Sequence, residues 1–117
     1  MARTVLIVDD HPSFRTSARR VLEDAGYEVI GEAPDGASAL AAIGAHRPDV
    51  VLLDVQLPDI DGFDVAARVT GRDDAPIVVL TSSRDGSDFG GMVARSGARG
   101  FVAKAELSGP RLEALLG

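Results

Sequence analysis

Short apolar runs alternate with amphipathic segments along the whole chain. The runs are four to seven residues long, which is the length of a strand rather than of a helix. The segments between them place apolar residues three or four positions apart, as helices do. The pattern therefore predicts five strands and five helices in strict alternation. The expected strands are Thr4–Val8, Tyr27–Ala33, Val50–Leu53, Ile77–Leu80 and Gly100–Ala103.

Local signals indicate where the helices begin and end. The first begins at Pro12, which suits a first helical turn, and ends at Gly26. The last takes Ser108 as its N-cap. The fourth contains Gly90-Gly91 and few large apolar residues, so we expect it to be the least stable. The expected helical ranges are 12–25, 36–45, 63–69 and 85–96, with a fifth helix after residue 108.

Strict alternation of strands and helices predicts an α/β fold, a doubly wound parallel sheet with helices on both faces. For five strands we expect the flavodoxin-like order 2-1-3-4-5, the known arrangement for such chains. In that order ligands bind beyond the carboxyl ends of the strands, near the switch between strands 1 and 3. A length of 117 residues predicts one domain, residues 1–117.

Composition narrows the classes of function. The chain has 18 acidic and 12 basic residues and a net charge of -6, which disfavours direct binding to a nucleic-acid backbone. It contains no cysteine, which excludes disulfides, thiolate nucleophiles and zinc-thiolate sites. No apolar stretch approaches the length that spans a membrane. These features predict a soluble, cytoplasmic domain.

Reactive side chains follow four of the five expected strands. Asp9 and Asp10 follow the first strand, and Asp54 follows the third. Because strands 1 and 3 are neighbours in the expected order, three carboxylates crowd one edge, which is unfavourable unless they share a cation. An all-oxygen site of this kind suits Mg²⁺. Thr81 and Lys104 follow the fourth and fifth strands, so a hydroxyl and an ammonium flank a carboxylate that is placed to attack phosphorus.

Lys104 carries particular information because 11 of the 12 basic residues are arginine. The single lysine falls where a compact, flexible positive charge suits a small phosphoryl group better than a planar guanidinium does. We expect its ammonium to pair loosely with Asp54 or to face solvent in the resting protein.

Four motifs, taken together, resemble the receiver domain of two-component response regulators over essentially the whole chain. They are "VDDHP" with Asp9 and Asp10, "LLDVQLPDIDG" with Asp54, "VLTSS" with Thr81, and "GARGFVAK" with Phe101 and Lys104. "DDHP" and the Lys104-Ala105 pair resemble the subfamily whose receivers precede a helix-turn-helix output domain. Many receivers have a proline after this lysine in a cis link, whereas Ala105 predicts a trans link here.

The resemblance implies a role for each of these residues. Asp54 accepts a phosphoryl group from the histidine of a kinase. Asp10, Asp54 and the Gln56 carbonyl bind Mg²⁺ directly, and Asp9 acts through water. Thr81 and Lys104 bind the phosphoryl oxygens. Phe101 turns inward as Thr81 moves.

The resemblance also implies partners and the type of protein. The implied partners are a histidine kinase and an output domain that is expected to bind DNA. The output domain is expected to be absent from this chain; the alternative is a receiver that stands alone. A homodimer on phosphorylation is allowed, and no direct contact with nucleic acid or membrane is expected. The domain is expected to be a phosphoacceptor rather than an enzyme, catalysing only its own phosphoryl transfer and dephosphorylation.

Other functions fit the sequence less well. Haloacid dehalogenase-like phosphatases carry a second aspartate two residues after the nucleophile, where this chain has Gln56. A nucleotide switch would need a P-loop, and none occurs. The stretch 59–64, "DIDGFD", lacks the glycine and glutamate that an EF-hand requires, so we interpret it as a turn into the third helix. His11, beside Pro12 at a helix start, is interpreted as a residue at the rim of the site, and His46 as a surface residue. The alternative that stays open is a phosphorylation-independent interaction module with the receiver fold.

Overall fold

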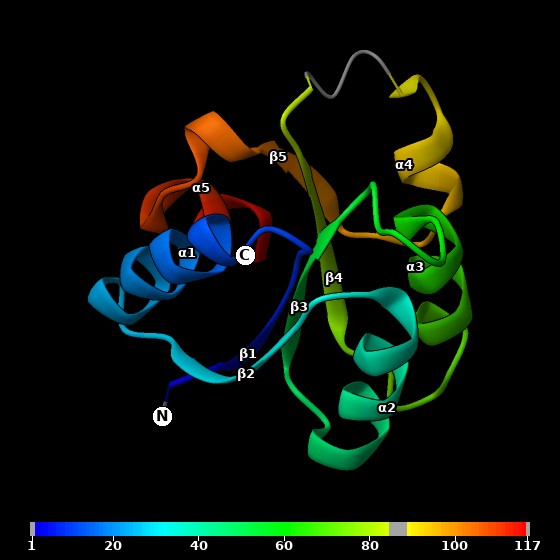
Figure 1. Cartoon of the computed structure of the whole chain (residues 1–117), viewed down its shortest axis with the longest axis horizontal. Coiled ribbons are helices and arrows are strands. Elements are labelled where there is room, and N and C mark those ends of the chain that lie inside the picture. The colour runs from blue at the N-terminus through cyan, green and yellow to red at the C-terminus, as the bar shows by residue number, and fades with distance from the viewer. Residues whose placement is uncertain (1, 85–88, 117) are drawn as a thin grey trace.

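The fold is a parallel sheet of five strands between two layers of helices (Figure 1). The computed structural model describes residues 2–84 and 89–116. The strand order is β2-β1-β3-β4-β5, and every neighbouring pair is parallel, which confirms the predicted doubly wound arrangement. The strands are β1 (Thr4–Val8), β2 (Glu28–Ala33), β3 (Val50–Asp54), β4 (Ile77–Ser82) and β5 (Gly100–Ala103).

The helices divide between the two faces of the sheet. Figure 1 shows α1 and α5 on one side and α2, α3 and α4 on the other. None of the helices in the described ranges has the length and apolar character needed to cross a membrane. The helices are α1 (Pro12–Asp24), α2 (Gly36–His46), α3 (Gly62–Thr70), α4 (Met92–Arg95) and α5 (Gly109–Leu116), and a 3-10 turn, η2 (Lys104–Glu106), precedes α5.

Successive residues of the central strands point into two different cores. On β3, Val51 and Leu53 pack with α2 and α3, while Val50 and Leu52 pack with α1 and α5. All four side chains are almost completely buried. A strand covered on both faces needs apolar residues at every position, which explains why these strands are continuous apolar runs rather than alternating ones.

The fourth helix is shorter than predicted within the described residues. We expected residues 85–96, but 85–88 lie outside the described part of the chain, and α4 comprises only Met92–Arg95. The helix follows Gly90-Gly91, two residues that disfavour helix, and none of its four residues is buried. It therefore has little packing to extend it.

The other local signals are confirmed. Helix α1 ends at Asp24, and Gly26 takes a positive φ of 95° just after it. The Ser108 hydroxyl accepts a hydrogen bond from the Arg111 amide at 3.2 Å, as an N-cap does. The Lys104–Ala105 peptide is trans.

Candidate functional site

The carboxyl ends of β1, β3, β4 and β5 bring the predicted site residues together. Asp54 is the last residue of β3, and Thr81 is its partner in register on β4. Asp9 directly follows β1, whose Val8 pairs with Leu53. Lys104 directly follows β5. Parallel pairing thus aligns four strand ends at one edge of the sheet, where we expected a ligand to bind.

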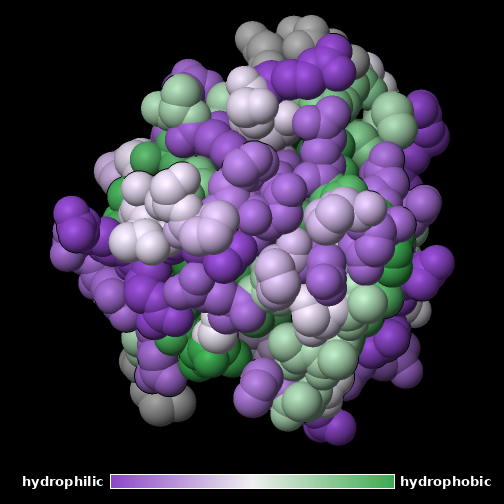
Figure 2. Space-filling model, viewed as in Figure 1, coloured by the Kyte–Doolittle hydropathy of each residue, from purple (hydrophilic) through white to green (hydrophobic). Residues whose placement is uncertain are grey.

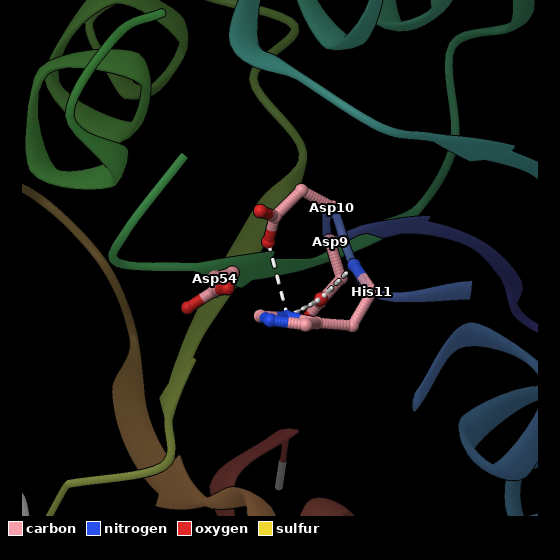
Figure 3. A group of neighbouring side chains, drawn as sticks. All are labelled: Asp9, Asp10, His11 and Asp54. Atoms are coloured by element: carbon pink, nitrogen blue, oxygen red, sulfur yellow. Dashed lines mark hydrogen bonds and ion pairs between the residues drawn. The ribbon is translucent and has the colours of Figure 1, made fainter. Parts of the chain in front are cut away.

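The acidic residues form one compact group, which Figure 3 shows together with His11. One oxygen from each of Asp9, Asp10 and Asp54 and one nitrogen of His11 lie within 4.8 Å of one another. Asp9 is fully buried and Asp54 is 3% exposed, whereas the Asp10 side chain is 37% exposed. The group therefore has a buried floor and an open, acidic rim.

This donor set fits a hard divalent cation such as Mg²⁺. Within the described ranges, Asp9 Oδ2 is buried and accepts no hydrogen bond of regular geometry, and the positive charge beside it is one ammonium, that of Lys104, which also faces Asp54. Buried carboxylates need positive charge close to them, and here one ammonium is shared between two carboxylates. Three carboxylates together offer the oxygen ligands that Mg²⁺ prefers.

Lys104 provides the positive charge inside the group. Its Nζ lies 2.6 Å from Asp9 Oδ2 and 3.3 Å from Asp54 Oδ2, and the side chain is only 15% exposed. Burial would lower the pKa of this ammonium, but the close Asp9 carboxylate and the charge of Asp54 outweigh it, so the pKa is raised. The expected pair with Asp54 is present at 3.3 Å, but the nearest carboxylate is that of Asp9, a contact that we did not predict.

Two residues of α1 that the sequence analysis did not place in the site also contact it. Lys104 Nζ lies 4.7 Å from the centre of the Phe14 ring, a cation–π distance. Arg15 donates a hydrogen bond from Nη1 to the backbone carbonyl of Asp9 at 2.6 Å and pairs with Glu32 at 3.0 Å. Phe14 thus covers the ammonium, and Arg15 holds the Asp9 backbone against α1 and β2.

The pKa of Asp54 is raised, first by burial and then by the negative charge of Asp9. The amide of Gln56, which donates to Asp54 Oδ1 at 3.2 Å, and the ammonium of Lys104 oppose this increase but do not cancel it. The Gln56 side chain itself is exposed. Without a further cation, the ionised Asp54 is held in an unfavourable place.

The raised pKa predicts that Asp54→Asn stabilises the fold at neutral pH. The pKa of Asp54 in the unfolded chain is about 3.9, and its pKa in the folded protein is higher, so the folded protein binds the Asp54 proton more tightly. The contribution of Asp54 to the free energy of unfolding is therefore most favourable at low pH and is lost as the pH rises through the folded pKa. We expect the variant to be more stable by about 1 kcal/mol at pH 7.5, since buried like charges repel strongly. Urea unfolding without divalent cations measures the difference.

The advantage of the variant should shrink as the pH is lowered, because wild-type Asp54 then becomes neutral as well. Asp73→Asn, in an exposed loop, is the matched control and should change stability little at either pH. A variant that is less stable than the wild type at pH 7.5 would show that the Lys104 contact outweighs the burial of Asp54.

The loop after Asp54 is held close to the strand that precedes it. The Val55 amide donates to the Thr81 carbonyl at 2.9 Å, and the Gly62 amide donates to the Val55 carbonyl at 2.7 Å. A Cβ on Gly62 would collide with the Asp54 carbonyl oxygen and lie 2.8 Å from the Val55 Cα. Gly62 therefore permits α3 to begin directly against the residue that carries the site.

The acidic stretch 59–64 forms a turn, as predicted. Asp61 is the N-cap of α3, and its carboxylate accepts a hydrogen bond from the Phe63 amide at 2.7 Å. Asp59 accepts hydrogen bonds from the amides of Gly36 and Ala37 at the start of α2, and these bonds lower its pKa. The two carboxylates thus hold helix ends in place.

Thr81 is the register partner of Asp54, and Phe101 on β5 is the register partner of Leu80, the residue before Thr81. Thr81 is 1% exposed. Phe101, on β5, is partly buried and its ring centre lies 5.6 Å from that of Phe89, which in turn lies 5.5 Å from that of Phe63. Three rings thus connect β5, the residues before α4 and the start of α3. The sequence did not reveal this contact, because the three residues are far apart along the chain.

Both histidines lie where the sequence analysis expected them. His46 lies exposed in the last turn of α2. His11 has a side chain that is 64% exposed, but its Nδ1 lies 3.1 Å from a carboxylate oxygen of both Asp9 and Asp10. It therefore lies at the rim of the acidic group, as expected.

Comparison with known proteins identifies a matching family and similar proteins. Residues 5–115 match the family described as the response regulator receiver domain. The chain is 44% identical over 101 residues to the probable transcriptional regulatory protein NarL of Mycobacterium tuberculosis, covering 86% of this chain and 47% of that protein. It is also 44% identical over 79 residues to a protein-glutamate methylesterase/protein-glutamine glutaminase of Hahella chejuensis, covering 68% of this chain and 23% of that protein.

The fold agrees with a solved receiver domain. The structure of the signal receiver domain of the putative response regulator NarL from Mycobacterium tuberculosis superposes with a TM-score of 0.87 at 38% identity, covering 99% of this chain and 98% of that one. The chain spans half or less of the length of the two curated relatives. Those two relatives carry names of different classes, so similarity in this region does not determine what the remainder of a protein does.

Proposed function

Because the chain belongs to the response regulator receiver domain family, we propose that it is a phosphorylation-dependent signalling switch whose Asp54 accepts a phosphoryl group from a histidine kinase. The observation that carries the proposal is the position of Asp54. Its carboxylate lies at the end of β3, grouped with the Asp9 and Asp10 carboxylates and 3.3 Å from the Lys104 ammonium. A nucleophile with acidic ligands beside it and a cation in contact suits transfer of a charged phosphoryl group.

The transfer needs one bond to form and one to break. An Asp54 carboxylate oxygen attacks phosphorus, the bond from phosphorus to the kinase histidine nitrogen breaks, and the histidine keeps the electron pair. The product is an acyl phosphate on Asp54. Lys104 pairs with one phosphoryl oxygen, and the Thr81 hydroxyl donates a hydrogen bond to another. Both residues border Asp54, by ion pair and by strand register respectively.

A divalent cation is part of the proposal. Asp10, Asp54 and the Gln56 carbonyl would hold Mg²⁺ directly, and Asp9 would act through water. When bound, the ion supplies positive charge that neutralises the oxygens of the transferred group. Two features support this assignment: three carboxylates are grouped around one ammonium, and the pKa of Asp54 is raised by burial and by the charge of Asp9 despite that ammonium.

The signal would leave the site through Thr81 and Phe101. As Thr81 moves toward the phosphoryl group, Phe101 turns inward, and its ring contact with Phe89 changes with it. The output is proposed to be a DNA-binding domain in the parent protein, supported by the transcriptional regulator that is similar to this chain and about twice as long. The domain itself, with a net charge of -6, is proposed to contact no nucleic acid.

The proposal extends to the cellular setting. We place the domain in the cytoplasm and allow a homodimer to form on phosphorylation. In this role it is not an enzyme acting on other substrates, since it catalyses only its own phosphorylation and dephosphorylation.

Intact-mass measurement tests the proposal. The protein is incubated with acetyl phosphate, a small phosphodonor, with Mg²⁺ or with a chelator. We expect the mass of one phosphoryl group to be added only with Mg²⁺, and no addition in Asp54→Asn. Asp73→Asn is the control, because it removes an exposed carboxylate in the loop after α3. This variant should gain the phosphoryl group as the wild type does.

Two results would contradict the proposal. Modification that persists in Asp54→Asn would place the phosphoacceptor elsewhere. An unmodified wild type, with both acetyl phosphate and a panel of kinases, would favour the phosphorylation-independent interaction module instead.

A further inference from the structure

His11 occupies a helix-capping position without capping the helix. It precedes Pro12 at the N-cap of α1, a place where a short polar side chain usually accepts a hydrogen bond from the helix. Its side chain makes no such bond. Figure 3 shows the imidazole folded back toward Asp9 and Asp10 instead. The side chain is therefore directed by the acidic group rather than by the helix.

The separation between His11 and Asp10 matches that between neighbouring ligands of one metal ion. His11 Nδ1 lies 3.1 Å from Oδ1 of Asp10, a proposed direct ligand, and also contacts Asp9 Oδ1 at 3.1 Å. Neighbouring ligands of an octahedral ion with bonds of about 2.1 Å are about 3 Å apart. One ring nitrogen of His11 lies within 4.8 Å of a carboxylate oxygen of Asp54. The imidazole is thus part of the same group of donors as the three carboxylates.

The backbone keeps the imidazole in this place. The His11 amide donates a hydrogen bond to Asp9 Oδ1 at 2.8 Å, and Arg15 holds the Asp9 carbonyl from the next turn of α1. These two hydrogen bonds fix the carboxylate and the carbonyl of Asp9, so they also fix the direction in which the backbone leaves β1 and enters His11. The side chain stays 64% exposed, so an ion can approach it from solvent.

A nitrogen ligand changes which ions a site prefers. Mg²⁺ binds oxygen ligands and gains little from imidazole. Mn²⁺ also suits an oxygen-rich site, but as a first-row transition ion it gains more from an added imidazole than Mg²⁺ does. We propose that His11 Nδ1 is a fourth protein ligand at the acidic site, and that the site therefore binds a divalent transition ion such as Mn²⁺ more tightly than Mg²⁺. This inference rests on the proposed function, since it concerns the same metal site.

The test uses Mn²⁺ alone as the probe. Electron spin echo envelope modulation of the bound ion detects nitrogen that is coordinated directly. We expect a nitrogen coupling in the wild type that disappears in His11→Asn. His46→Asn is the matched control, because His46 is the other histidine of the chain and lies on α2; that variant should keep the coupling.

Binding constants give a second readout. His11→Asn should weaken Mn²⁺ binding about tenfold or more, as loss of one metal contact commonly does. Its Mg²⁺ affinity should change much less, so the ratio of the two affinities falls. His46→Asn should leave both affinities unchanged. Circular dichroism checks that the variants are folded, which we expect because both histidine side chains are exposed.

The outcomes separate this inference from the proposed function. Mn²⁺ bound without a nitrogen coupling, but lost in Asp10→Asn, would overturn the role of His11 and leave the carboxylate site intact. A coupling that persists in His11→Asn would also overturn it. Failure of the wild type to bind either ion, or binding unaffected by Asp10→Asn and Asp54→Asn, would overturn the metal site itself.

Discussion

Replacing Lys104 with methionine is expected to destabilise the fold by about 3 kcal/mol at pH 7, the lower end of the range for breaking a buried ion pair. The variant leaves the Asp9 carboxylate, which is fully buried, without its close cation. It also removes the contact of the ammonium with the Phe14 ring. Methionine fills similar space, so the loss reports the charge more than the packing. Urea unfolding measures it, and a fall of about 10 °C in Tm is expected.

A double variant identifies the cause. Asn in place of Asp9 keeps an oxygen for the His11 amide but removes the charge. If the unpaired carboxylate causes the loss, Asp9→Asn combined with Lys104→Met is more stable than Lys104→Met alone. Added Mg²⁺ should stabilise the single Lys104→Met variant more than the wild type, because a bound cation then replaces the missing one.

Arg111→Met is the matched control for loss of a basic residue. Arg111 pairs with Glu106 at 3.2 Å, but both side chains are more than half exposed. Exposed pairs contribute about 0–1 kcal/mol, so this variant should be nearly as stable as the wild type. If Lys104→Met and Arg111→Met lowered the free energy of unfolding equally, the buried ion pair would contribute no more to stability than the exposed pair.

Gly62→Ala is expected to destabilise the domain by about 2–3 kcal/mol, as inserting a methyl group into filled space commonly does. The added Cβ would meet the carbonyl oxygen of Asp54 and the Cα of Val55. Both are backbone atoms, which cannot rotate away as a side chain does. Either α3 or the end of β3 must shift, so phosphorylation of Asp54 by acetyl phosphate should also slow. Thermal unfolding and intact-mass time courses measure the two effects.

Gly44→Ala provides the control. Gly44 lies inside α2, and an added Cβ there meets no atom within 4 Å. Alanine favours helix over glycine by about 0.5–1 kcal/mol, so this variant should be more stable than the wild type, with unchanged phosphorylation. If Gly62→Ala behaved in the same way, the close approach of α3 to Asp54 would not limit the site.

The fold could be predicted from local patterns, because the apolar runs and the residues at the helix ends indicate the same strands and helices. Apolar runs such as Val50 to Leu53 are continuous, which indicates strands buried on both faces, and the structure places both faces under helices. Helix ends also had local causes, in Pro12, Gly26 and Ser108. The fourth helix was the exception. Its periodicity extended across Gly90-Gly91, and the described part of the chain retains only Met92–Arg95 as helix.

Positions in the site could be predicted where a strand end defines them. Asp9, Asp54, Thr81 and Lys104 all lie at the carboxyl ends of strands, and parallel register brings them to one edge. The proposed roles of these residues await the experiments above. Distances within the group could not be predicted, so the expected pair of Lys104 with Asp54 is present but its closer contact with Asp9 was missed.

Local sequence patterns were enough to predict the strands and helices, the parallel α/β class, and three acids and one lysine at strand ends, because these depend on residues close together in the chain. Four contacts became visible only in the folded chain: Lys104 lies closest to Asp9, Phe14 covers Lys104, Arg15 holds the Asp9 carbonyl, and His11 turns toward the carboxylates. Those contacts join β1, α1 and the residue after β5, and their geometry depends on how a helix packs on the sheet. No local pattern encodes that packing, since it is the joint result of both cores.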